Sequence, residues 1–217
     1  MDQDELKRTV KSEIDAGFFS VDVDRVKSAV QSLPWVQSVS VRRVWPDSLH
    51  LEITEHIAVA RWGREYLINQ RGHLFKITKL DANVMTPDNE LSFSSLPHIS
   101  GPKDMYSELF TQYQQMQMII ESTGLSVDKV EVNARRSMRV TLNNGIVLLL
   151  GRVVEETYDY QELARFVIAY KQTLLHREAE ISEIDLRYTN GFAVQWKDKN
   201  LVYNTDTTRF RNVRGFV

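Results

Sequence analysis

The most regular pattern of apolar and polar residues lies between residues 33 and 56. Apolar residues alternate with polar ones in two runs, which are Val39 and Val41 and then Leu49, Leu51 and Ile53. A period of two is typical of strands that bury one face. Pro46 and Asp47 between the runs favour a chain reversal, because proline presets the φ of the first central turn position. The pattern therefore predicts a β-hairpin, with Trp45 capping its apolar face.

Two helices are predicted before this hairpin, and they would cover its apolar face. An apolar stripe at helical spacing follows Asp22, a residue type that caps helix N-termini, and its members are Val23, Val26, Val30 and Leu33. Pro34 ends this helix. A similar stripe within residues 2–15 consists of Leu6, Val10 and Ile14. The predicted order is therefore helix, helix, strand, strand.

The rest of the chain is predicted to contain more strands and two further helices. The expected strands are residues 58–62, 66–68, 73–77, 127–132, 138–142, 146–150, 184–188 and 192–196. Apolar stripes predict helices over residues 105–120 and 155–176. Residues 80–103 are rich in Pro, Ser and Asn and are expected to form an irregular connection on the surface. The predicted fold class is α+β.

Composition narrows the function classes. With 217 residues and 42% hydrophobic content, the chain can form one large or two small domains. Its net charge of −2, with both signs interspersed, argues against a nucleic-acid binder. It has no cysteine, which excludes disulfides, thiolate metal sites and a cysteine nucleophile. No apolar run approaches the ~20 residues that cross a bilayer, so the chain as given is expected to be soluble, as a whole protein or as a fragment.

The sequence contains no recognisable catalytic motif. Its five histidines, at positions 50, 56, 73, 98 and 176, lack the spacing of metal ligands. One carboxylate cluster consists of Glu155, Glu156 and Asp159. This cluster lies at a predicted helix start, where acidic side chains complement the helix dipole. We therefore expect no enzyme activity, no metal and no cofactor.

Exposed aromatic and basic residues are the remaining candidates. Tyr188 and Trp196 flank the predicted turn at Asn190 and Gly191, and such side chains are either core residues or anchors for an added strand. The residues alone leave these two interpretations open. Arg135 and Arg136 precede the central hairpin, where a charged strand end is most often simply solvated. Together these observations indicate a two-part α+β binding protein.

Three segments resemble motifs of the bacterial FtsQ/DivIB cell-division family. LPWVQSVSVRRVWPDSLHLEITEHIAVARW, residues 33–62, resembles the segment that closes the POTRA domain of that family and enters its β domain. NARRSMRVTLNNGIVLLLGR (133–152) and EIDLRYTNGFAVQW (183–196) are similar to motifs of the β domain, in the same order. The likeness covers nearly the whole chain up to Trp196.

The resemblance implies an architecture of three parts. Residues 1–57 would form a POTRA-like helix-helix-strand-strand domain, whose first strand would precede Met1. Residues 58–200 would form a mixed β-sheet domain with two flanking helices. Residues 201–217 would be a C-terminal tail or an extra edge strand, for example through Leu201–Tyr203.

The resemblance also implies a function without catalysis. It implies a protein of the inner membrane at the division septum, with this part in the periplasm and the membrane reached only through an N-terminal helix absent from this chain. The implied partners are FtsB and FtsL, with an FtsB strand added beside the last β-hairpin, and other divisome proteins. By motif match, the residues that bind the FtsB-like partner would be Arg136, Arg187, Tyr188, Gly191 and Trp196. The matching POTRA recruitment positions are Ser38, Val41 and Arg43.

A protein of a different class is also compatible with the sequence. A periplasmic POTRA-type chaperone or translocation module would take many extended peptides along its POTRA strand. A divisome scaffold would instead select one coiled-coil partner at its C-terminal edge. A hydrolase is the least favoured class.

Overall fold

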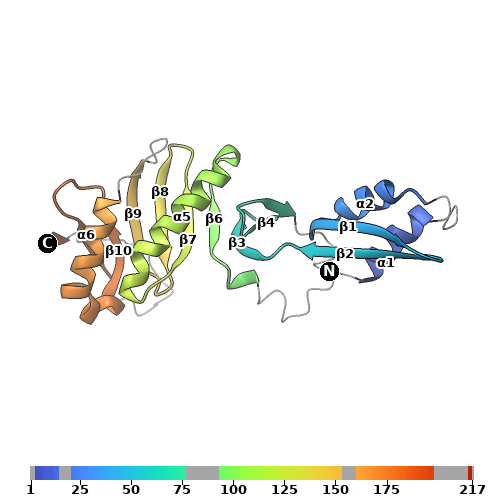
Figure 1. Ribbon diagram of the computed structural model, residues 1–217. Helices are drawn as coiled ribbons and strands as arrows, with labels where there is room; N and C mark the ends of the chain where they lie inside the picture. Colours follow the sequence, from blue (N-terminus) through green and yellow to red (C-terminus); the bar gives the residue numbers. More distant parts are fainter. Residues whose placement is uncertain (1–2, 15–20, 77–92, 153–159, 198–214, 217) are drawn as a thin grey trace, which may run out of the picture. The chain divides into compact units, whose positions relative to one another are not determined.

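The computed structural model describes residues 3–14, 21–76, 93–152, 160–197 and 215–216 (Figure 1). The chain divides into two compact units, Met1–Leu96 and Pro97–Val217. Each unit combines helices with β-structure, and the predicted α+β class is confirmed.

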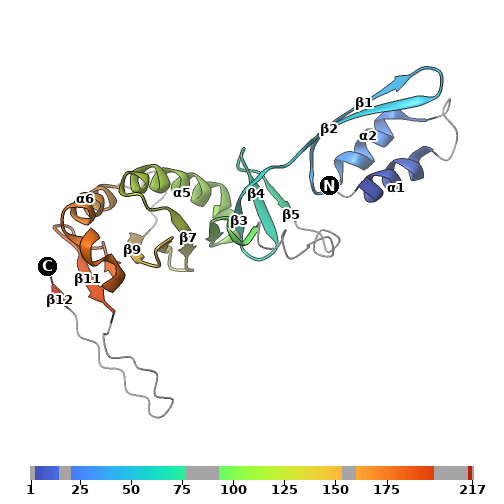
Figure 2. The same ribbon diagram turned by 90° about the horizontal axis from the view of Figure 1, so that it is seen from below.

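The first unit begins with two helices and a long hairpin. These elements are α1 (Gln3–Ile14), α2 (Val23–Gln31), β1 (Val36–Val44) and β2 (Ser48–Glu55). The strands are antiparallel, with Val41 opposite Leu51. Both helices lie along the same face of the hairpin (Figure 2). Asp22 caps α2 by accepting bonds from the backbone N–H groups of Asp24 and Arg25. The predicted hairpin and its helical cover are therefore confirmed.

The core of this part is made mainly of valine. Its buried members are Val21, Val26, Val30, Val36 and Val39, and the apolar residues of both helices and both strands pack around them. Valine suits this site because its branched side chain packs well on a pleated surface.

The prediction for Trp45 was wrong. Its side chain is 74% exposed, so it does not cap the apolar face of the hairpin. In β1 every residue from Arg42 onward is exposed, including Val44. The hairpin tip therefore extends beyond the helices that bury its base, and the turn sequence could not reveal how far that cover reaches.

A small meander completes the first unit. It consists of β3 (Ala58–Trp62), β4 (Tyr66–Asn69) and β5 (Leu74–Lys76), which pair antiparallel in this order. Phe75 links the meander to the preceding hairpin, because its ring lies 5.2 Å from that of Trp35 and 4.6 Å from that of His56. The side-chain amide of Asn69 lies 2.8 Å from Nδ1 of His56. These contacts do not test which segments fold independently, so the domain boundary at residue 57 stays a prediction.

The second unit is a mixed sheet. Its strands are β6 (His98–Ser100), β7 (Val127–Val132), β8 (Ser137–Leu142), β9 (Val147–Arg152), β10 (Ile181–Asp185), β11 (Ala193–Trp196) and β12 (Gly215–Phe216), adjacent in that order. The pairs β6–β7 and β9–β10 are parallel, and the other pairs are antiparallel. The parallel β9–β10 pair requires the crossover that the helical segment before β10 supplies.

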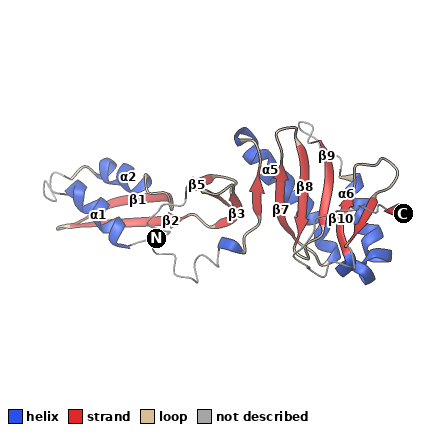
Figure 3. Cartoon of the chain, turned by 180° about the vertical axis from the view of Figure 1, so that it is seen from behind, coloured by secondary structure: helices blue, strands red, loops and turns tan. Residues whose placement is uncertain are grey.

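Two helices cover one face of this sheet. They are α5 (Tyr106–Ile120) and α6 (Gln161–Ala169), and α6 continues through a π-helical turn, Tyr170–Leu174, into 3-10 turns over Leu175–Glu180. Seen from behind, the strands lie in front of both helices (Figure 3). The prediction of a mixed sheet with two flanking helices is confirmed. The opposite face carries no helix from the part of the chain that the structure describes.

The end of the sheet differs from the pattern-based prediction. β10 ends at Asp185, so Tyr188 lies in the connection to β11 and not in a strand. The backbone N–H of Leu186 still donates to the carbonyl of Leu149, but the chain then leaves the sheet. Two other predictions, the cluster at residues 155–159 and an edge strand at 201–203, lie outside the described residues.

Candidate partner-binding site

The terminal hairpin, β10 and β11, is held from several sides. Its register places Ile184 opposite Val194, and both side chains are buried. At its base the Lys197 N–H donates to the Glu180 carbonyl at 2.6 Å. The Arg177 guanidinium lies 4.0 Å from the ring centroid of Trp196, a cation–π arrangement. Trp196, a predicted binding residue, therefore has its ring already packed on one side within the unit.

The connection between these strands carries two further predicted residues. Arg165 of α6 donates to the carbonyl of Thr189, which fastens the loop to the helix. The Tyr188 side chain is 47% exposed. Gly191 does not adopt a left-handed φ, and a Cβ atom there would meet nothing within 4 Å. The described fold therefore does not require glycine at position 191.

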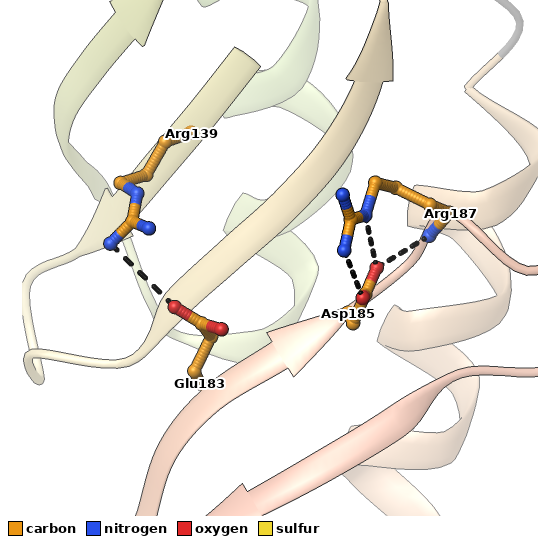
Figure 4. Close-up of polar contacts among 4 residues, drawn as sticks. All are labelled: Arg139, Glu183, Asp185 and Arg187. Carbon is orange, nitrogen blue, oxygen red and sulfur yellow. Dashed lines mark hydrogen bonds and ion pairs between the residues drawn. The ribbon is translucent and has the colours of Figure 1, made fainter. Parts of the chain in front are cut away.

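Arg187 is fixed in place by Asp185. Its Nε and Nη2 atoms donate to the two carboxylate oxygens at 2.7 and 2.6 Å, and its backbone N–H donates to Oδ1 at 3.1 Å (Figure 4). The hydrogen bond to Asp185 raises the pKa of Arg187, outweighing the opposing effect of desolvation. The guanidinium stays charged, and about half of its side chain remains exposed.

A shallow pocket lies beside this arginine. It has a volume of about 420 Å³ and is lined by Ser100, Glu131, Val132, Asn133, Ser137, Met138, Arg139, Leu149 and Arg187. Arg139 on its wall forms an ion pair of 3.6 Å with Glu183 (Figure 4). Two arginines, each paired with a carboxylate of β10, thus meet at one place on the sheet.

Arg136 belongs to the turn beside the same pocket. Its φ is +61°, in the left-handed region, and its N–H donates to the Asn133 carbonyl at 2.8 Å. The Asn133 side chain accepts from the N–H groups of Arg135 and Ser137 at 2.9 and 3.0 Å. Asn133 thereby shapes the turn, and Arg136 projects between two residues that line the pocket.

The structure thus groups the predicted residues into two sets. Arg136 and Arg187 meet at the pocket, whereas Tyr188, Gly191 and Trp196 lie on the terminal hairpin and do not line it. Sequence reasoning missed Arg139, Glu183, Asp185 and Asn133. Asp185 and Arg187 could have been found, because residues two apart in an extended segment share a face. The pairing of Arg139 with Glu183 has no sequence signal, because it depends on the order of strands in the sheet.

The three predicted POTRA residues do not form one patch. Val41 is partly buried and packs against the valine core. Arg43 has the same parity in β1, and its guanidinium donates to the carbonyl of Val21. Ser38 is exposed, lies opposite Thr54 and has the other parity. Val41 and Arg43 therefore face the helices, and Ser38 faces away from them.

Metal and membrane features were also sought in the described ranges. Within them, no group of three or more His, Asp or Glu residues could hold a metal ion. None of the helices described in the structure is both long and apolar enough to span a bilayer.

Comparisons with known proteins give one consistent result. Residues 60–187 match the family described as cell division protein FtsQ/DivIB, C-terminal, and residues 1–56 match the POTRA domain, FtsQ-type. The FtsQ of Coxiella burnetii is 33% identical over 194 residues, which cover 89% of this chain and 74% of that protein. The FtsQ of Cellvibrio japonicus is 35% identical, covering 86% of this chain and 54% of that protein. For Escherichia coli FtsQ the values are 32%, 89% and 67%.

These matches favour a division protein over a general chaperone, since both parts of the chain match FtsQ-type families in order. The observed architecture agrees, with a helix-helix-strand-strand segment followed by a mixed sheet. The chain belongs to the FtsQ/DivIB family of cell-division proteins.

Proposed function

We propose that this chain is a non-catalytic scaffold of the divisome. Its terminal β-hairpin binds the FtsB/FtsL complex during septum formation, and its POTRA part contacts other division proteins. It acts in the periplasm and is held at the inner membrane, at the septum, by a segment that precedes the described residues.

The observation that carries this proposal is the half-exposed ring of Tyr188 beside strand β11. β11 is the last strand of the sheet before the two-residue strand β12, so most of its outer backbone groups are available to a partner strand. An added strand satisfies such groups, and side chains next to the edge give specificity. A ring that is 47% exposed at this position leaves apolar surface for a partner to cover.

The charges near the edge favour a partner with acidic residues. Arg187 is oriented by Asp185 and retains an exposed guanidinium, and Arg136 lies on the turn beside the pocket. Arginine recognises carboxylates through paired hydrogen bonds. The nearby carboxylates of β10 are already engaged with arginines, so an acidic partner side chain must share or displace them. Such exchange favours selectivity over high affinity.

Calorimetric titration of the extracytoplasmic part of FtsB from the same genome tests the proposal. Wild-type protein should bind it, and Arg136→Glu should weaken binding about tenfold or more through charge reversal. Arg64→Glu is a matched control, because Arg64 is also exposed but lies at the β3–β4 turn of the first unit. Absence of binding to the wild type, or equal weakening by both variants, would contradict the proposal.

For the POTRA part, we propose that recruitment uses the β1 face that carries Ser38. Val41 and Arg43 contribute to the fold, because one packs on the core and the other holds the Val21 carbonyl. Ser38→Arg should therefore reduce septal localisation while leaving the melting temperature nearly unchanged. Arg43→Ala should lower the melting temperature. The opposite pattern would assign recruitment to the helix-facing side.

A further inference from the structure

The outer edge of β11 already has a neighbour within this chain. Gly215–Phe216 forms β12, which pairs antiparallel with β11 so that Ala193 lies opposite Phe216 and Val194 opposite Gly215. Figure 2 shows β12 beside β11 at the end of the sheet. The segment that reaches this edge is the extreme C-terminus of the 217-residue chain.

This edge is the one at which the partner strand would be added. The other side of β11 is paired with β10 from Ile181 to Asp185, so only the outer side can accept another strand. Each backbone N–H and C=O group of an edge strand that points outward can serve one neighbouring strand at a time. Residues 215–216 and a partner strand therefore cannot both pair with Ala193 and Val194.

We propose that the C-terminal segment Gly215–Phe216 is an intramolecular competitor for the partner-binding edge. This inference rests on the proposed function and adds a regulatory element to it. The segment protects the β11 edge when no partner is bound, and the partner strand displaces it. Because the competitor belongs to the same chain, its effect does not depend on protein concentration.

The size of the effect follows from the population of the free edge. The apparent dissociation constant of the partner equals the intrinsic constant divided by the fraction of molecules with an open edge. The pairing involves only two residues of the tail. We therefore expect a modest effect, with partner affinity lowered about three- to tenfold relative to a protein whose tail cannot pair.

A disulfide test uses the absence of natural cysteine from the chain. In the double variant Ala193→Cys, Phe216→Cys the two thiols replace directly opposed residues, whose Cα atoms lie about 4.5–5.5 Å apart in antiparallel pairs, within disulfide range. Mild oxidation should give an intramolecular bond faster than in the control Ala193→Cys, Asn204→Cys. Equal rates in the two variants would overturn the pairing of the tail with β11, whatever the partner does.

Binding to the partner is then measured in two ways. The oxidised Ala193→Cys, Phe216→Cys protein should bind the FtsB extracytoplasmic part at least tenfold more weakly than the same protein after reduction. The full chain with Gly215→Pro and Phe216→Pro lacks both N–H donors of the tail strand and should bind about three- to tenfold more tightly than the wild type. Asn204→Pro with Thr205→Pro is the control for added proline and should show no gain.

The outcomes separate this inference from the proposed function. If FtsB binds the wild type and the tail proline variant equally, competition is overturned while the scaffold function stands. If FtsB binds neither of them, nor the reduced cysteine variant, the proposed function fails and competition fails with it. The oxidation rates still report on pairing of the tail in that case.

Discussion

The replacement of Tyr188 by alanine separates a partner anchor from a core residue. A tyrosine buries on the order of 200 Å² when fully covered. With 47% of the side chain exposed, about 100 Å² remains for a partner to cover. At about 25 cal/mol per Å², this area corresponds to at most ~2.5 kcal/mol of binding free energy, or roughly 50-fold in the dissociation constant.

The folding cost of the same substitution should be smaller than that of a core tyrosine. The covered half of the ring loses a similar area, but part of that area is also covered in the unfolded ensemble, so about 1–2 kcal/mol is expected. Tyr170 is only 1% exposed, and its replacement by alanine should cost about 3–5 kcal/mol. For a chain of this size, 1 kcal/mol shifts the melting temperature by about 2–4 °C.

Thermal melts and calorimetric titration with the FtsB extracytoplasmic part measure the two effects. Tyr66→Ala is the matched surface control, because Tyr66 is 39% exposed and lies in β4 of the first unit. It should cost similar stability but leave partner affinity unchanged. The reasoning is refuted if Tyr188→Ala melts as early as Tyr170→Ala, or if it binds the partner as tightly as wild type.

Three other predictions concern the fold. Burial, and secondarily the charge of His73, lower the pKa of His56, so stability should be full above about pH 6.5 and fall as the pH drops below it; melts at pH 7.5 and 5.5 should show a smaller difference in His56→Gln. Gly101→Ala places a Cβ 2.6 Å from Cδ1 of the buried Leu109 and should cost about 1–3 kcal/mol in urea unfolding, unlike Gly151→Ala, which meets no atom. Trp45→Ala should change the melting temperature by less than about 2 °C, since the side chain is 74% exposed, and a large drop would show hidden packing.

Features that depend on neighbouring residues in the chain were predictable from the sequence. The hairpin of β1 and β2 follows from an alternation of period two, which has only one face to bury. The cap at Asp22 and the turn at Gly145, where φ is +84°, depend on the chemistry of single residues. The two helices that flank the sheet follow from apolar stripes for the same reason.

Features that depend on strand order were decided by the tertiary structure. Arg139 meets Glu183 because β10 pairs in parallel with β9, which itself pairs with β8, and no local pattern encodes that order. Trp45 is exposed because the helices of the first unit end short of the hairpin tip.

The edge of β11 illustrates the difference most directly. The sequence alone determined that β10 and β11 form the last hairpin, since their alternation and turn residues are local. Only the tertiary structure decided that Gly215–Phe216 pairs with that hairpin. Two residues carry no periodicity, and backbone pairing depends on which edge is open and within reach rather than on side-chain identity.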